Sequence, residues 1–301
     1  MVDQGGETGW MNAAVQVIVS RALPSGGFPL QPSGQFDPAS TAWAAIALSL
    51  VQQATDLRSQ ACRTLAQSQL SDGRVSVSAA HPETYWPTSV AVMAFNLTTG
   101  FEGAARAGSR FLLQNSGLCW DKGEDKTYGH DTSLPGWPWV AGTHSWVEPT
   151  ALAVLALTSS GLQTHPRVKQ AVSVILDRQI PTGGWNYGNT TVFGNMLPAT
   201  PENTGLALAA LSGLVAPAQV AKSIDFLRSE LQGIRTPFTL SWGIIGLAAW
   251  DVRPTEADSW LGASFRLQDR YGSYDTCLLA QLIVASLARK GMAKLLMESA
   301  A

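Results

Sequence analysis

Carboxylate side chains stand close in front of threonines that begin apolar segments of the sequence. Glu148 and Glu202 each lie two residues before such a threonine, in the sequences EPT and ENT, and Asp275 lies directly before another. A carboxyl group held in an apolar pocket keeps its proton near neutral pH and can then act as a general acid. We therefore treat these three residues as candidate catalytic residues, and Asp37 as a candidate substrate-binding residue. The alternative is that they cap helices, whose N-termini favour negative charge.

Aromatic side chains gather near the same carboxylates. The stretch LPGWPWVAGTHSW, residues 134–146, leads directly to Glu148. Aromatic ring faces stabilise cations by roughly 0.5–2 kcal/mol per contact. The candidate substrate-binding residues of this kind are Tyr85, Trp86, Trp137, Trp139, His144, Trp146 and Trp242. Ordinary filling of the core is the alternative, above all for Trp242 and for Trp43.

Metal-ligand patterns are weak in this sequence. Asp275 and Cys277 form a D-x-C pattern, but a zinc site needs a third ligand, and His144 in another repeat is the nearest histidine. Three further carboxylates stand in a Gly-rich loop with lysines, where we expect them to be solvated: Asp121, Glu124 and Asp125. We predict no metal and no other cofactor.

Composition limits the class of protein. The chain has 301 residues, of which 46% are hydrophobic and 14% charged, and its net charge of −2 argues against a nucleic-acid partner. We expect no signal peptide, because the first residues lack a basic segment followed by an apolar one, and no apolar run reaches the roughly 20 residues of a membrane-spanning helix. Three cysteines stand far apart without a CxxC pair. Reduced thiols of this kind predict a cytoplasmic protein without a transmembrane segment.

A repeat positions the candidate residues. A glutamine is followed six residues later by a large apolar residue, with glycine between them. The pairs are Gln69–Val75, Gln114–Trp120, Gln179–Trp185, Gln232–Phe238 and Gln268–Tyr274. A degenerate first copy ends at Phe28.

Each copy separates two different kinds of predicted helix. Before it stands an amphipathic, charged helix, and these cover residues 11–23, 55–69, 102–114, 166–179, 216–231 and 255–268. After it stands a nearly uncharged helix, and these cover residues 41–50, 88–98, 150–158, 204–214, 241–250 and 276–288. Helices that are apolar all round are buried, whereas helices with one apolar stripe lie at a surface.

The alternation predicts an all-α fold, an (α/α)6 toroid of six helix hairpins in two concentric rings around a central cavity. An irregular α-solenoid is the alternative. We expect one toroid domain over residues 1–301, with a long loop insertion at 115–145. Long loops in compact domains are usually functional or mobile, so this loop is a candidate lid.

The Gln…Gly-x-Trp pattern resembles the QW repeat of squalene-hopene and oxidosqualene cyclases, and residues 175–185 (ILDRQIPTGGW) are the nearest copy. The resemblance covers essentially the whole chain, and protein prenyltransferase β subunits share the toroid that it implies. It assigns Trp120 and Trp185 to the scaffold. Class II terpene cyclases carry their acid in a D-x-D-D-T-A or D-C-T-A pattern. Here Glu148 and Glu202 stand at the acid position, and no repeat contains the full D-x-D-D.

The resemblance implies a class II terpene cyclase-like enzyme. Its substrate would be an isoprenoid or a similar apolar small molecule, protonated in the toroid cavity, and a peripheral membrane contact fits such a substrate. One alternative is a non-catalytic toroid that binds an apolar ligand or a partner protein. Another is a zinc-dependent prenyltransferase-like subunit with a helical-repeat partner. Burial and pKa of Glu148 and Glu202 distinguish these alternatives, because an exposed, charged glutamate would exclude protonation.

Overall fold

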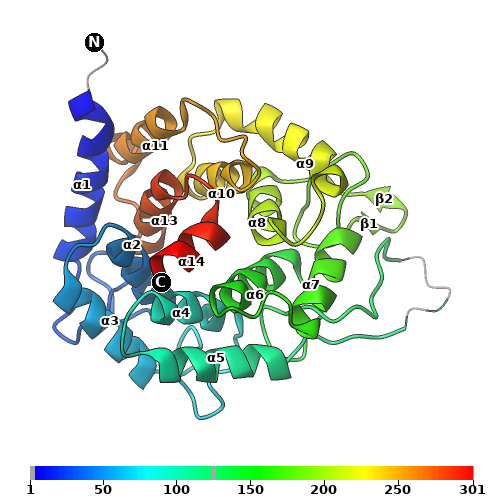
Figure 1. The fold of residues 1–301 in the computed structure, drawn as a ribbon, viewed down its shortest axis with the longest axis horizontal. Helices are drawn as coiled ribbons and strands as arrows, with labels where there is room; N and C mark the ends of the chain where they lie inside the picture. The colour runs from blue at the N-terminus through cyan, green and yellow to red at the C-terminus, as the bar shows by residue number, and fades with distance from the viewer. Residues whose placement is uncertain (1–3, 122, 124–126, 301) are drawn as a thin grey trace.

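The chain folds into two concentric rings of helices, as a computed structural model shows (Figure 1). The structure describes residues 4–121, 123 and 127–300. The predicted all-helical toroid is confirmed. Two short strands form a hairpin at its edge, β1 (Thr191–Val192) and β2 (Asn195–Met196).

The inner ring is built from the nearly uncharged helices. They are α2 (Pro38–Leu50), α4 (Trp86–Asn96), α6 (Val147–Ser159), α8 (Pro201–Leu211), α10 (Pro237–Ala248) and α13 (Thr276–Leu287). Each contacts the next in this order, and α13 contacts α2, which closes the circle. A proline stands in the first turn of most of them, where its fixed φ favours the start of a helix.

The amphipathic helices form the outer ring. They are α1 (Gln4–Ser20), α3 (Thr55–Gln67), α5 (Glu102–Gln114), α7 (Pro166–Asp177), α9 (Pro217–Glu230) and α11 (Ala257–Arg266). The short helices η1 (Leu231–Gly233) and α12 (Gln268–Tyr271) follow α9 and α11. Each outer helix after the first packs on the inner helix that precedes it in the chain.

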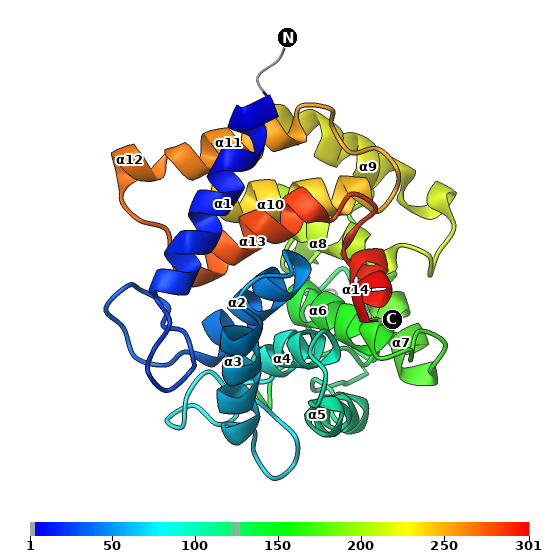
Figure 2. The same cartoon turned by 60° about the vertical axis from the view of Figure 1, so that its left-hand side comes forward.

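The first outer helix packs on the last inner helix. α1 crosses α13 and α11 and contacts both (Figure 2), and Arg21 donates hydrogen bonds to the carbonyl of Tyr274 at 2.8 Å and to the hydroxyl of Thr276 at 3.2 Å. The two ends of the helical series therefore meet, and the ring has no end repeat.

The glycines of the repeat allow a close approach between outer helices. Gly73 has a φ of +94°, and a Cβ at this position would meet the carbonyl of Ala107 in α5. Gly183, with a φ of +109°, lies in the same way against Lys222 of α9. The repeat glutamines support these contacts, since Gln69 donates to the carbonyl of Ala104 at 3.1 Å. The turns thus require glycine both for conformation and for space.

Threonines near the start of the inner helices form hydrogen bonds with the backbone of the segment that precedes each helix. The hydroxyls of four of them accept a hydrogen bond from a backbone N–H at 2.9–3.0 Å and donate to the carbonyl of the same residue. The pairs are Thr41 with Phe28, Thr88 with Val75, Thr150 with Trp137 and Thr204 with Trp185. Trp137, and not Trp120, therefore occupies the scaffold position of its repeat.

Two buried arginines hold the loop insertion of residues 115–145 against the ring. Arg167 of α7 donates to the carbonyls of Pro135 at 2.7 Å and Gly136 at 2.9 Å, and its guanidinium lies 4.0 Å from the centre of the Trp137 ring. Arg178, which follows α7, donates to the backbone carbonyl of Asp131 at 3.2 Å. The described part of this loop contains turns and isolated bridges but no helix.

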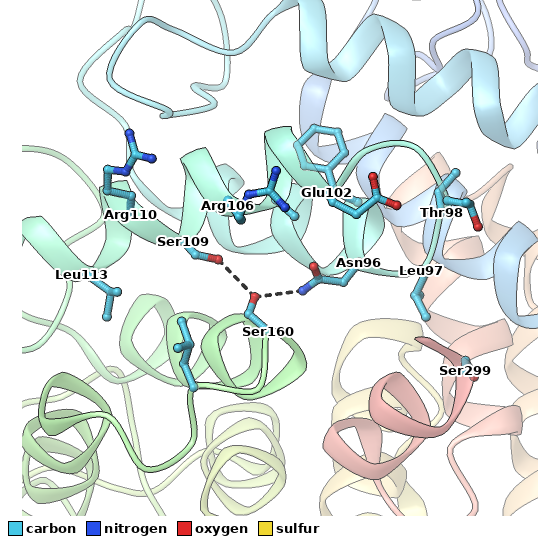
Figure 3. Close-up of a pocket in the computed structure, with 14 residues that line it drawn as sticks. Asn96, Leu97, Thr98, Glu102, Arg106, Ser109, Arg110, Leu113, Ser160 and Ser299 are labelled. Carbon is cyan, nitrogen blue, oxygen red and sulfur yellow. Dashed lines mark hydrogen bonds between the residues drawn. The ribbon is translucent and has the colours of Figure 1, made fainter. Parts of the chain in front are cut away.

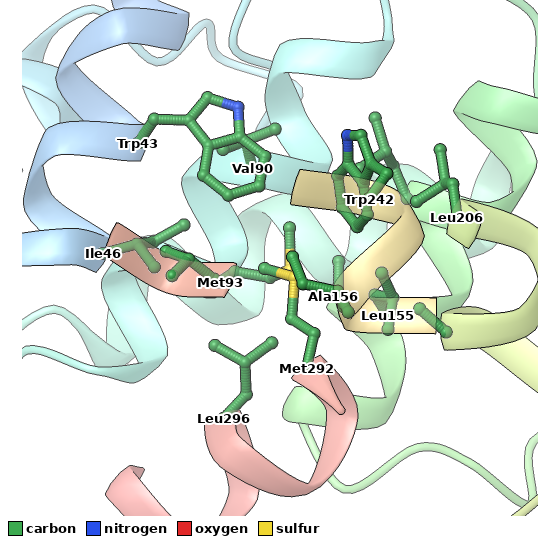
Figure 4. Packing of buried hydrophobic residues seen from close by; sticks show 14 of the residues in the cluster. Trp43, Ile46, Val90, Met93, Leu155, Ala156, Leu206, Trp242, Met292 and Leu296 are labelled. Carbon is green, nitrogen blue, oxygen red and sulfur yellow. The ribbon is translucent and has the colours of Figure 1, made fainter. Parts of the chain in front are cut away.

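Apolar side chains fill the axis of the ring. Side chains from different inner helices meet there, and Trp43 of α2 and Trp242 of α10 are in edge contact with ring centres 5.9 Å apart (Figure 4). A helix beyond the predicted ones, α14 (Met292–Ala300), lies inside the outline of the inner ring (Figure 1) and contacts α4, α6 and α8. Space for a ligand along this axis is therefore restricted.

Within the described residues, no single helix is both long and apolar enough to cross a membrane. α13 and α14 pass that test together by length and composition, but they are bent by 85° relative to each other.

Candidate functional site

Two glutamates stand at the starts of neighbouring inner helices, and one influences the pKa of the other. Glu148 is the second residue of α6 and Glu202 is the second residue of α8. Glu148 is half-buried, and this burial, with the nearby charge of Glu202 as a smaller cause, raises its pKa from 4.5 to about 7. We call this end of the ring the N-terminal face. A protonated carboxyl group near neutral pH is what a general acid requires.

The surroundings of the two glutamates differ. Among the described residues, Glu148 has no hydrogen-bond or ion-pair partner. Glu202 accepts a hydrogen bond from the hydroxyl of Thr239, in α10, at 3.3 Å. The half-buried carboxyl group of Glu148, which no described protein group satisfies, is therefore available to a substrate. The contact with Thr239 had no sequence signal, because it depends on how α8 and α10 pack.

Asp37 and Asp275 act as helix caps. Asp37 accepts a hydrogen bond from the N–H of Ser40 at 2.7 Å, and Asp275 accepts one from the N–H of Leu278 at 2.8 Å. Burial raises the pKa of Asp275. The neighbouring Cys277 lies 3.4 Å from the hydroxyl of Ser40, and burial raises its pKa to about 12, so it is not a ready nucleophile. Capping gives both aspartates a structural role.

The alignment on threonines holds for α6 and α8 but not for α13. Thr150 and Thr204 are the fourth residues of their helices, whereas Thr276 is the first residue of α13. The Thr276 hydroxyl donates to the carbonyl of Pro29, at the seam between the last and first repeats. Asp275 therefore lies outside its helix and not at the position of Glu148.

Half-buried aromatic residues flank the N-terminal face. The rings of Trp86 and Trp139 are in edge contact with centres 6.0 Å apart. Those of His144 and Trp146 lie 4.3 Å apart, and Trp146 is the residue just before α6. Burial lowers the pKa of His144, which favours the neutral ring. The structure thus brings these four candidates to the start of α4 and α6.

Three other aromatic candidates lie elsewhere. Tyr85 is turned toward the outer ring, where its ring contacts that of Phe111 in α5 at 4.9 Å. Trp137 is only 1% exposed and donates its indole N–H to the carbonyl of Leu112 at 3.0 Å. Trp242 fills the axis. Tyr85 and Trp137 are therefore scaffold residues, because their rings pack against the outer helices.

The remaining candidates for metals and for the scaffold can also be placed. The predicted scaffold residue Trp120 is 39% exposed, at the edge of the loop insertion. No group of three potential metal ligands occurs among the described residues. Asp121 is described and exposed, whereas Glu124 and Asp125 lie outside the described residues.

A hollow lies at the other end of the ring, where the inner helices end. It measures about 620 Å³ between α4, α5, the end of α6 and α14 (Figure 3). On its floor Ser160 is hydrogen bonded to Asn96 at 2.9 Å and to Ser109 at 3.1 Å. None of the candidate carboxylates lines it, so it is not the space in front of Glu148.

Comparisons with known proteins give the fold. No protein-family model and no curated protein matches the chain. Among solved structures, a protein from Actinoplanes is 20% identical, with a TM-score of 0.60 over 96% of this chain and 99% of that one. A variant of the type II terpene cyclase MstE from Scytonema, in complex with geranylgeranyl dihydroxybenzoate, is 13% identical, with a TM-score of 0.64 over 97% and 98%. An inactive variant of the α-1,6-mannanase GH76A of Salegentibacter sp. HEL1_6, in complex with α-1,6-mannotetrose, is 11% identical, with a TM-score of 0.64 over 96% and 99%.

Proposed function

We propose that the protein is an enzyme in which Glu148 is the general acid and the substrate is an isoprenoid or a similarly apolar molecule. One observation carries this proposal: Glu148 is half-buried, has no protein partner among the described residues, and has a pKa raised to about 7. A structural cap would instead accept a hydrogen bond from its own helix, as Asp37 and Asp275 do.

The raised pKa limits the kind of atom that Glu148 can protonate. A carboxyl group with a pKa of about 7 holds its proton at neutral pH but is a weak acid. It therefore suits transfer to an oxygen, such as that of an epoxide, better than transfer to an alkene carbon. The proton moves from Glu148 to that oxygen as a C–O bond breaks, which leaves Glu148 as the carboxylate and a cation on carbon.

Aromatic residues at the same end can stabilise such a cation. Trp86, Trp139 and Trp146 are half-buried there, and a ring face attracts a cation by roughly 0.5–2 kcal/mol. The likeness in fold to a type II terpene cyclase is in keeping with this chemistry. Because the axis is packed, the proposal has the substrate bind on the N-terminal face and not in a deep tunnel.

A second candidate is a glycoside hydrolase, and the pairing of Glu148 with Glu202 favours it. Glycosidases use two carboxyl groups, one as the acid and one as the base or nucleophile, and they also transfer the proton to oxygen. The likeness in fold to the mannanase fits this candidate. The further alternative is a toroid that binds an apolar ligand or a partner without catalysis. The packed axis favours it, because little space for a substrate remains inside the ring.

Assays with two substrate classes distinguish these functions. Polyprenyl epoxides and α-1,6-linked manno-oligosaccharides are incubated separately with the purified protein, and products are analysed by mass spectrometry. We expect conversion of the epoxide, and a loss of kcat of about 100-fold or more in Glu148→Gln, as is usual for removal of a general acid. The matched control is Glu230→Gln, an exposed glutamate of α9, which should leave kcat unchanged.

Each outcome decides between candidates. Turnover of the oligosaccharide alone, abolished by both Glu148→Gln and Glu202→Gln, establishes the glycosidase instead. Epoxide turnover that survives Glu148→Gln refutes the role of Glu148. Binding of polyprenyl compounds without turnover of either class leaves the non-catalytic toroid.

A further inference from the structure

One amide side chain stands among apolar side chains near the axis of the ring. Five inner helices have an apolar residue at their fifth or sixth position, namely Trp43, Val90, Leu152, Leu206 and Trp242. Figure 4 shows four of these side chains around the axis. α13 has Gln281 at its sixth position instead. The glutamine is therefore the polar member of an otherwise apolar layer.

Gln281 faces the axis of the ring. Thr276, at the start of α13, accepts a hydrogen bond from Arg21, which follows α1. Ser286, near the end of α13, donates one to Asp258 of α11 at 3.2 Å. Both residues therefore mark the outer side of α13. Gln281 is five residues from each of them, which is about 140° around an α-helix. Its side chain points away from the outer ring.

The amide of Gln281 has no hydrogen-bond partner among the described residues. The side chain is only 5% exposed, and its oxygen is buried without a hydrogen bond. Its nitrogen forms none with a described group either. A buried amide without a partner destabilises a folded protein, whereas an apolar residue at this position would not. A ligand that supplies the hydrogen bond accounts for the glutamine.

Two indole N–H groups at the same level are in the same situation. Trp43 and Trp242 lie on α2 and α10, the two helices that flank α13, and their rings are in contact. They are 3% and 2% exposed, and neither indole nitrogen has a hydrogen-bond partner among the described residues. Other indoles donate to backbone carbonyls, namely those of Trp137, Trp185 and Trp250.

Accessible space reaches this level from the N-terminal face. Gln281 and the two tryptophans keep a small exposed area, whereas Ile46 and Val284, one turn deeper, have none. One turn nearer the face, Cys277 is half-buried. Buried side chains of α14, Met292 and Leu296, close the deep side. Figure 4 shows both indole nitrogens on the sides of their rings that face away from α14.

We propose that Gln281, Trp43 and Trp242 form a polar site at the floor of the N-terminal face, and that this site binds a hydroxyl group of an otherwise apolar ligand. A hydroxyl group can donate to the amide oxygen and accept from an indole N–H at the same time. A charged group does not fit, because a buried charge needs a partner. The inner helices, which are described in full, carry charge only at Glu148 and Glu202, in the first turns.

The site lies across the ring from Glu148. The inner helices follow one another in the order α2, α4, α6, α8, α10 and α13, so α13 is opposite α6 (Figure 1). The inference rests on the proposed function in placing the substrate on the N-terminal face. It adds that the substrate carries a hydroxyl group, held near Gln281, at a distance from the group that Glu148 protonates.

Two probes that differ only in the hydroxyl group test the site. They are geraniol and the hydrocarbon in which hydrogen replaces its hydroxyl group. Equilibrium dialysis with gas chromatography gives the dissociation constant of each probe. We expect the ratio of the two constants, hydrocarbon over alcohol, to fall about tenfold in Gln281→Leu, because the hydroxyl group loses a hydrogen bond. Comparing this ratio between proteins cancels the difference in hydration of the probes. The matched control is Gln53→Leu, an exposed glutamine after α2, which should keep the wild-type ratio.

A tryptophan variant gives an independent measurement. Trp242→Phe keeps an aromatic ring and removes the N–H, so the ratio should again fall, by about three- to tenfold. The matched control is Trp250→Phe, because the indole N–H of Trp250 already donates to the carbonyl of Leu208 at 3.0 Å. That variant should keep the wild-type ratio.

The stability of Gln281→Leu distinguishes a binding role from a structural one. Leucine needs no hydrogen-bond partner, so the urea concentration at the midpoint of unfolding should not fall. A lower midpoint with an unchanged ratio, or a variant that does not fold, shows a structural glutamine and overturns the inference. So does a wild-type protein that binds neither probe, or a ratio that is unchanged in both Gln281→Leu and Trp242→Phe.

The same measurement separates this inference from the proposed function. Glu148→Gln should keep the wild-type ratio of dissociation constants. A ratio that falls in Glu148→Gln and not in Gln281→Leu places the hydroxyl group at Glu148 and overturns the inference. A failed activity assay together with the expected ratios refutes only the proposed function.

Discussion

Glu148→Gln should make the folded protein more stable at high pH while it removes the proposed acid. The pKa of Glu148 is about 7 in the folded protein and ordinarily 4.5, and each pKa unit corresponds to about 1.4 kcal/mol. Because the folded-state pKa is raised, the contribution to stability is fully present below pH 4.5 and is lost as pH rises through 7. The charged side chain therefore lowers the free energy of unfolding by about 3 kcal/mol at pH 8. Glutamine has the same shape and carries no charge at any of these pH values.

Urea denaturation of both proteins between pH 4 and pH 8 measures this effect. The free energy of unfolding of the variant minus that of wild type should grow by about 3 kcal/mol from pH 4 to pH 8, mostly between pH 5 and 7.5. Glu102→Gln is a control of opposite sign, because a hydrogen bond from the N–H of Gly100 lowers the pKa of Glu102. A difference between Glu148→Gln and wild type that does not depend on pH would refute the raised pKa and the acid role together.

Three further predictions concern stability, each measured by urea denaturation. Gly73→Ala should lower the free energy of unfolding by about 3 kcal/mol or more. Gly100 has a similar φ but nothing near its Cβ, so Gly100→Ala should lower it by only about 1 kcal/mol. Equal losses in the two variants would show that the contact with α5 is unimportant. Arg167→Lys should cost about 2–3 kcal/mol, because lysine cannot reproduce the three hydrogen bonds of the guanidinium, and a loss below 0.5 kcal/mol would mean that the loop insertion is held otherwise. Met292→Ala should cost about 2–4 kcal/mol through the cavity it leaves. Met297→Ala should cost less than about 0.5 kcal/mol, and similar losses in both would contradict the burial described for α14.

The toroid could be predicted because its signal is distributed over the chain. Apolar helices such as 150–158 alternate with amphipathic ones such as 166–179, and burial follows this alternation. Glu148 and Glu202 could be placed because the threonines two residues later have the same structural role in both helices. The pKa of Glu148 could not be predicted, since it depends on burial by neighbouring helices.

The assignment of Trp120 to the scaffold failed for a reason visible in the sequence. The spacing from Gln114 to Trp120 matched the repeat. The loop insertion, however, places Trp120 away from the inner ring, and the chain reaches the inner ring again only at Trp137. Trp137 stands 13 residues before Thr150, the same distance that separates Phe28 from Thr41. The 13-residue spacing also holds for Val75 and Thr88, but Trp185 stands 19 residues before Thr204, so neither spacing identifies the hydrogen-bonded residue in every repeat.

α14 was not predicted, although its sequence carries a weak signal. Met292, Leu295 and Leu296 have helical spacing, and Gly291 stands directly before them. A sequence shows that such a helix has an apolar face, but not which surface covers it. The axis of the ring is formed by several helices from distant parts of the chain, so its occupant follows from tertiary structure alone.

The contact between α1 and α13 has a consequence for how the protein folds. The hydrogen bond from Arg21 to Thr276 joins residues 255 positions apart. During synthesis the buried side chains of α1, among them Trp10, Val15 and Ile18, lack the surfaces of α11 and α13 until these late helices have left the ribosome. Contacts between such distant residues slow folding. The seam of the ring is thus where the nascent chain is most exposed to aggregation, and where a chaperone would have most to protect.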